Sequence, residues 1–177
     1  MNSYELFIKQ KNRFVEKLIK YEPDVLITFD PKSLNQYNHN NWFMMFNPNN
    51  WGKYLKGFGV HFAFIYYKDS VGGGEYIRLP VGVENPFKID FRKQFKSDVV
   101  SCVKQNDIKI GDCKLWPDVG FRKTKLIEPE FVELNDHSWE ITIENYMMLK
   151  EFNSIVAKLI KQYNSKGCFI GNLYEPA

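Results

Sequence analysis

The sequence lacks the residue patterns that identify most enzymes. His39, His61 and His137 are far apart, none has a metal-ligating neighbour at helical spacing, and no serine, cysteine or lysine stands in a recognisable nucleophile motif. The three glycines at 72–74 are not followed by the Gly-Lys-Ser/Thr of a phosphate-binding loop, so we interpret them as the tip of a hairpin. We therefore expect a non-enzymatic protein that needs no metal and no cofactor.

Cysteines are few, and long apolar runs are absent. The three cysteines include no Cys-x-x-Cys pair, and the chain has no Asn-x-Ser/Thr sequon, so nothing indicates a disulfide-linked secreted glycoprotein. The N-terminal segment has no apolar region of the signal-peptide kind, and no apolar run approaches membrane-spanning length. We expect a cytoplasmic protein with no membrane partner.

The remaining composition is that of an ordinary globular protein, with 177 residues, 44% of them hydrophobic and 25% charged. Apolar residues at helical spacing predict three main helices, near residues 3–21, 89–105 and 145–165. Apolar runs predict strands at 25–29, 42–46 and 138–143, a hairpin at 59–84, and short strands between 108 and 134. Because strands and helices are grouped apart, we predict a single α+β domain over residues 1–177 with a mainly antiparallel sheet.

Several residues mark the expected boundaries of these elements. Asn2 and Glu5 have the spacing of a capping box, and Asp90 is a candidate N-cap of the second helix. Gly167 is placed to follow the C-terminus of the last helix. Pro80 lacks an N–H donor, which predicts an edge or a bulge at that point of the hairpin.

Negative charge is missing from residues 31–68, which hold four lysines and many aromatic residues but no aspartate or glutamate. A second basic segment follows at 114–125. Lysines attract phosphates, aromatic faces stack on bases, and asparagine amides can pair with base edges. The sequence therefore predicts a nucleic-acid-binding surface made of Trp42, Trp51, Lys53, Tyr54, Lys56, Tyr67, Lys68, Trp116, Arg122, Lys123 and Lys125.

The segment "NNWFMMFNPNNW" (residues 40–51) admits two interpretations. In a strand, alternate side chains point to opposite faces, so one set of residues 42–46 should enter the core. Asparagine clusters are also ordinary turn formers. We expect the segment to do both jobs, with Trp51 and Tyr54 facing a ligand from the turn-rich connection.

Positive charge is missing in turn from residues 126–149, where six acids occur without a lysine or arginine: Glu128, Glu130, Glu133, Asp136, Glu140 and Glu144. An acidic face can orient a nucleic-acid binder, but it can equally bind a basic protein partner through charge complementarity. A protein-binding inhibitor or adaptor that uses residues 128–144 is therefore the first alternative.

A second alternative is a metal-dependent nuclease of the PD-(D/E)xK type. Such a site needs an acid on one strand and an acid-x-Lys on the next, so that a divalent ion and a lysine meet at the scissile phosphate. Asp24 and the segment Asp112-Cys113-Lys114 offer these residues. A helix is predicted between them and the pattern is short, so we interpret Asp112 and Lys114 as solvated turn residues.

The order of elements, with "WFMMF", "HFAFIYYKD" and "EYIRLPVGVENP" before an amphipathic helix, resembles the N-terminal DNA-recognition domain of McrB-type restriction proteins. The matching residues are Trp42, Phe43, Tyr66, Tyr67, Lys68, Asp69 and the segment from Gly82 to Pro86. The resemblance implies a module of a genome-defence system that binds modified DNA and accepts an extruded base in an aromatic pocket. The long connection at 47–59 departs from that layout.

Overall fold

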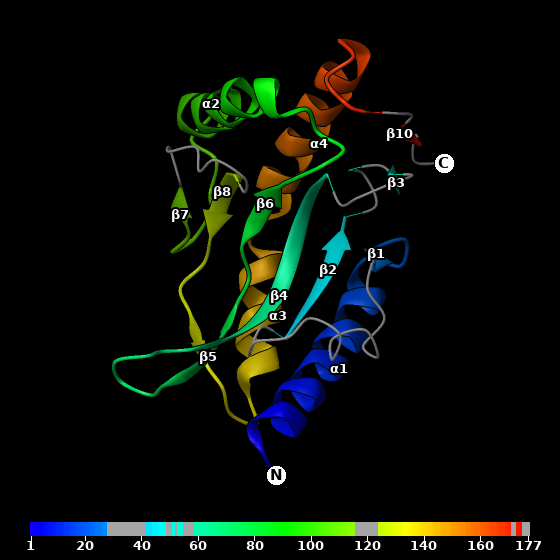
Figure 1. Ribbon diagram of the computed structural model, residues 1–177. Helices are drawn as coiled ribbons and strands as arrows, with labels where there is room; N and C mark the ends of the chain where they lie inside the picture. Colours follow the sequence, from blue (N-terminus) through cyan, green and yellow to red (C-terminus); the bar gives the residue numbers. More distant parts are fainter. Residues whose placement is uncertain are drawn as a thin grey trace.

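Four helices and an antiparallel sheet make up the part of the chain that the computed structural model describes, namely residues 1–27, 42–48, 51, 53–54, 59–115, 124–170 and 173–174 (Figure 1). The helices are α1 (Ser3–Tyr21), α2 (Ile89–Gln105), α3 (Ser138–Met147) and α4 (Lys150–Ser165). The predictions at 3–21 and 89–105 are confirmed. The third predicted helix is in fact two, because the chain turns between α3 and α4.

The main sheet contains eight strands: β1 (Leu26–Ile27), β2 (Phe43–Asn47), β4 (Val60–Lys68), β5 (Glu75–Arg78), β6 (Val81–Val83), β7 (Lys114–Leu115), β8 (Thr124–Glu128) and β9 (Val132–Glu133). Its order is β1-β2-β4-β6-β8-β7, with β5 pairing with β4 and β9 pairing with β5. All of these pairings are antiparallel. Two short strands, β3 (Lys53–Tyr54) and β10 (Leu173–Tyr174), pair separately. The predicted α+β class with an antiparallel sheet is confirmed.

The predicted hairpin at 59–84 is the centre of the sheet. β4 pairs with β5 beyond Ile65 and with β6 before Ala63, in one continuous register. Pro80 lies between β5 and β6, where its carbonyl accepts a hydrogen bond from the N–H of Ala63 (3.0 Å) but its own nitrogen cannot return one. β5 pairs on its outer side with β9 and β6 with β8, so Pro80 does not lie at an edge of the sheet. The bulge predicted as the alternative is present beside it, as a register shift between Val81 and Gly82.

The predicted boundary residues have mixed outcomes. Asn2 and Glu5 form the capping box, in which Asn2 Oδ1 accepts from the Glu5 N–H (2.8 Å). Gly167 has φ +73°, as expected after the last helix. The prediction for Asp90 is wrong, because the N-cap of α2 is Lys88 and Asp90 lies in the first turn of the helix.

The predicted strand at 138–143 is also wrong, because these residues begin α3. Ser138, Thr142 and Tyr146 recur at a spacing of four and are buried, which is a helical stripe that the alternation of Ile141 and Ile143 conceals. The Thr142 hydroxyl donates to the Ser138 carbonyl (2.8 Å), a bond that a helix permits and an extended strand does not. β-branched residues lower helix propensity by only tenths of a kcal/mol, so burial of this stripe decides the structure.

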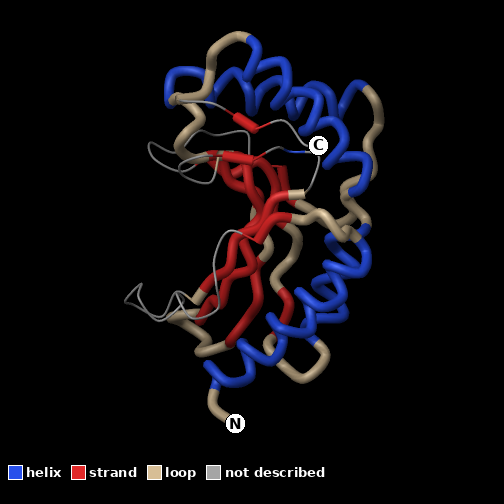
Figure 2. Tube along the Cα trace, turned by 90° about the vertical axis from the view of Figure 1, so that its right-hand side faces the viewer, coloured by secondary structure: helices blue, strands red, loops and turns tan. Residues whose placement is uncertain are grey.

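The core lies between the sheet and the helices, which follow one side of the sheet in Figure 2. Side chains from even positions of β2 and β4 face the helices. Phe46 and Phe64 contact Phe14 of α1, and Phe62 stacks on Phe46 with ring centroids 5.2 Å apart. No described helix lies on the opposite side of the sheet, toward which the odd positions of β2 and β4 point.

Candidate binding face of the sheet

Several of the predicted nucleic-acid-binding residues cannot be placed by their side chains. Lys56, Trp116, Arg122 and Lys123 lie outside the described residues. Lys53 and Tyr54 form β3, whose backbone pairs with β10. The predictions for these six residues therefore stay predictions.

The expectation that Trp51 faces a ligand is wrong. Its side chain has no exposed surface, and its indole N–H donates to the backbone carbonyl of Asn153 in α4 (2.9 Å). Its ring stacks on Phe62 with centroids 5.2 Å apart. A buried tryptophan needs a partner for its N–H, and α4 supplies one from a distant part of the chain.

Trp42 is also part of the packing rather than a free stacking surface. Its ring lies 4.2 Å from Tyr66 and 5.0 Å from Tyr4 of α1, measured between centroids, and the residue is partly buried. Met44 and Phe46 share its strand parity and are buried. The expectation that one parity of residues 42–46 enters the core is confirmed.

The other parity lines a hollow of about 280 Å³ on the side of the sheet away from the helices, which we call the sheet hollow. Phe43, Met45, Ala63 and Ile65 supply apolar side chains, and Pro80 lies beside them. The polar members of its lining are His61, Arg78, Glu84 and Lys125. The hollow is thus apolar at its base, with ionisable groups around it.

Two cations at this hollow converge on one buried carboxylate. The Arg78 guanidinium donates twice from Nη2 to the Glu128 carboxylate (2.8 Å each) and once from Nε (3.0 Å). Lys125 Nζ lies 3.6 Å from the same carboxylate. Glu128 is 3% exposed, whereas the Lys125 side chain is 38% exposed. Glu84 in the lining is a second carboxylate, so the two cations and two carboxylates around the hollow balance in formal charge, with Glu128 buried and the Lys125 side chain the more exposed group.

Aromatic residues extend this face beyond Arg78. The guanidinium carbon lies 5.0 Å from the centroid of Phe131 and 5.6 Å from that of Tyr67, and the two rings meet edge to face at 5.3 Å. Tyr67 and Lys125 also line a second hollow of about 520 Å³, together with Lys114. The structure thus brings two of the predicted residues, Tyr67 and Lys125, to one surface. Lys68 is exposed at the end of β4, opposite Glu75.

Sequence reasoning missed Arg78, which lines both hollows, and Phe131, which lines the larger one. Arg78 lies in β5 opposite Ile65 of β4, so the odd parity of β4 could have placed it on this face. Nothing local marks Phe131, because its position depends on the pairing of β9 with β5.

The nuclease alternative requires acidic side chains that together could hold a metal ion. Among the residues that the structure describes, no group of three or more His, Cys, Asp or Glu side chains is arranged to hold a metal ion. Asp112 and Lys114 do line the larger hollow with Glu128, but that carboxylate is held by Arg78. Burial and, to a smaller extent, the nearby Asp112 raise the pKa of the Cys113 thiol to about 12, so the thiolate is disfavoured at neutral pH.

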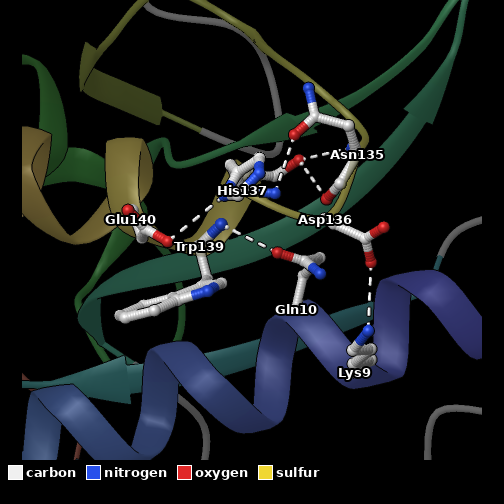
Figure 3. Close-up of polar contacts among 8 residues, drawn as sticks. Lys9, Gln10, Asn135, Asp136, His137, Trp139 and Glu140 are labelled. Atoms are coloured by element: carbon white, nitrogen blue, oxygen red, sulfur yellow. Dashed lines mark hydrogen bonds and ion pairs between the residues drawn. The ribbon is translucent and has the colours of Figure 1, made fainter.

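The acidic run at 128–144 is divided among different surroundings. Glu128 points to Arg78, and Asp136 forms an ion pair with Lys9 of α1 (3.0 Å). Glu140 lies 3.4 Å from the His137 ring (Figure 3). Two members of the run therefore pair with cations on other elements, and the binding of a basic partner by residues 128–144 stays a prediction.

Figure 3 also shows how this junction is built. Gln10 of α1 accepts a hydrogen bond through Oε1 from the backbone N–H of Trp139 (3.1 Å), which lies in the first turn of α3. The first N–H groups of a helix have no partner within the helix, so Gln10 supplies one from a neighbouring helix. The contact fixes α3 against α1.

No family model, no curated protein and no solved structure matches this chain. The likeness to McrB-type domains therefore stays a prediction. In the described part of the chain no helix is long and apolar enough to cross a membrane.

Proposed function

We propose that the protein binds nucleic acid through the side of the sheet that faces away from the helices, without catalysing a reaction. The observation that carries this proposal is the sheet hollow, where apolar side chains lie beside the Arg78 and Lys125 cations. A nucleotide has a flat apolar base and a charged phosphate. The apolar side chains of the hollow can contact the base, and the cations can contact the phosphate. The proposed occupant is a single unstacked base.

His61 belongs to the lining of the sheet hollow, where its Nδ1 lies 3.2 Å from the Gly59 carbonyl. The residue is 3% exposed, so it shapes the hollow and is not the group that we propose to read the base. Modified DNA, which the resemblance to McrB-type domains implies, is the ligand class that we propose to examine first.

Substitutions of Lys125 and Phe43 test the phosphate contact and the stacking contact separately. Lys125→Ala should lower the slope of log affinity against log salt by about one unit, because one phosphate contact is lost. Phe43→Ala should weaken binding roughly five- to a hundredfold at every salt concentration, because a stacking contact contributes about 1–3 kcal/mol. Fluorescence anisotropy with labelled single-stranded and duplex oligonucleotides, with and without modified bases, measures both effects.

Two exposed residues of α2 serve as matched controls. Phe91→Ala and Lys104→Ala remove the same side chains from a helix on the opposite side of the sheet, and should leave affinity and salt slope unchanged. Thermal unfolding of each variant identifies any loss of folding. Undetectable binding by the wild-type protein at low salt, or equal losses in the α2 controls, would disprove the proposal.

A further inference from the structure

A separate hollow of about 280 Å³ lies between α3 and the segment that joins β8 to β9, and we call it the acidic groove. Three of its lining residues are large and apolar yet substantially exposed: Phe131 at 44%, Ile141 at 46% and Met148 at 50%. Three others are acids, namely Asp112, Glu130 and Glu133. Exposed apolar side chains gathered in a groove with polar surroundings are typical of an interaction site.

The apolar part of the groove is one stripe of a helix. Ile141, Asn145 and Met148 follow one another at spacings of four and three, so they lie on the same side of α3 and its C-cap. The stripe around Thr142 and Tyr146 is buried against the core. α3 therefore presents two stripes. One is buried against the core, and the other, which includes Ile141 and Met148, is not covered in the described structure.

The charge of the groove has one sign. No lysine, arginine or histidine lines it, and none of its three acids forms an ion pair within the described part of the chain. The last turn of α3 contains no basic residue either, so the partial negative charge of the helix C-terminus is not offset there. Phosphates would be repelled here. The groove shares no residue with the sheet hollow, but it adjoins the larger hollow through Asp112, Glu130 and Phe131.

We infer that the acidic groove binds an amphipathic helix of a partner protein, with an apolar stripe flanked by lysine or arginine. An exposed helical stripe presents ridges that pack into the grooves of another helix, and apolar side chains at i, i+3, i+4 and i+7 of the partner would meet Phe131, Ile141 and Met148. Its basic residues would then face Asp112, Glu130 and Glu133. This inference does not depend on nucleic-acid binding.

The test uses two synthetic helical peptides of about 18 residues with leucine at the same helical spacing. The other positions are mostly lysine in one peptide and mostly glutamate in the second. Titration into the full chain, followed by carbon-13 methyl NMR, should shift the Ile141 and Met148 methyl signals with the lysine peptide only. Ile19 and Ile89 are exposed on α1 and α2, so their methyl signals should stay in place.

Charge and apolar contacts are then removed one at a time. Glu130→Gln/Glu133→Gln should weaken the lysine peptide about two- to thirtyfold at low salt, from two exposed charge contacts, and the difference should shrink as salt rises. Ile141→Ser and Met148→Ser change half-exposed side chains and should weaken binding at all salt concentrations, and thermal unfolding of each variant identifies any loss of folding. The control Glu5→Gln/Glu16→Gln removes two acids from exposed positions of α1 and should have no effect.

Four results would overturn the inference. The first is absence of binding, and the second is equal binding of the lysine and glutamate peptides. The third is a concentration-dependent shift of the Ile141 signal without any peptide, since that would identify a second copy of this chain as the occupant. Shifts of similar size at Ile19 would equally exclude a specific groove.

Discussion

Replacing Trp51 distinguishes a structural residue from a ligand-binding one. The ring has no exposed surface, stacks on Phe62, and donates its N–H to the Asn153 carbonyl at 2.9 Å. Trp51→Ala removes the ring and the donor together, whereas Trp51→Phe keeps an aromatic ring and removes the donor. If the packing is as described, both changes act on stability.

The expected sizes follow from the burial. Emptying the site of a large buried aromatic costs about 3–5 kcal/mol, and leaving a buried carbonyl without its donor costs about 1–3 kcal/mol. A domain of this size loses about 2–4 °C in Tm for each kcal/mol. We therefore expect Trp51→Ala to lower Tm by roughly 6–20 °C, and Trp51→Phe by roughly 2–12 °C.

Far-UV circular dichroism is the suitable assay, because the chain has four tryptophans and removing one alters the fluorescence signal itself. Trp139→Phe is the control, since its ring is only partly buried and should change Tm less. The reasoning fails if Trp51→Ala unfolds within about 2 °C of the wild type while its affinity for oligonucleotides falls. That result would place the ring at a ligand surface.

Three further changes test other contacts. Arg78→Met should lower the free energy of unfolding, measured by urea denaturation, by about 1–3 kcal/mol, because the buried Glu128 carboxylate loses the hydrogen bonds from the guanidinium. Burial raises the pKa of the Glu22 carboxyl, although the hydrogen bond from Tyr146 opposes the shift. The protonated carboxyl therefore stabilises the folded state in acid, and this stabilisation is lost as pH rises through the raised pKa. Glu22→Gln should therefore raise Tm near neutral pH, and the gain should shrink at about pH 4. Gly167→Ala should cost about 1–2 kcal/mol by calorimetry, and Gly167→Asn less, because φ is +73° there.

Elements governed by local patterns were predictable from the sequence. α1 and α2 have apolar residues at helical spacing over many turns, and the capping box of Asn2 and Glu5 lies within one turn. The hairpin at 59–84 likewise joins neighbouring strands through a glycine-rich tip. In each case the residues that determine the structure are close together in the chain.

α3 and Trp51 were mispredicted because their partners are distant. The N–H of Trp139 is bonded by Gln10, and the indole of Trp51 by the Asn153 carbonyl. Residues 138–143 alternate in polarity as a strand does, and residues 47–52 have the composition of a turn. Residues 138–143 become helical, and the Trp51 ring becomes buried, only through contacts with distant parts of the chain.

The candidate surfaces show the same limit in their charges. Counting acids along 128–144 predicts one acidic face, but Glu128 meets Arg78 from β5 and Asp136 meets Lys9 from α1. Glu130 and Glu133 are left beside exposed apolar side chains, and Asp112 joins them from the turn before β7. A surface depends on which charges are neutralised by other elements, so its sign follows from the strand order rather than from the composition of any one segment.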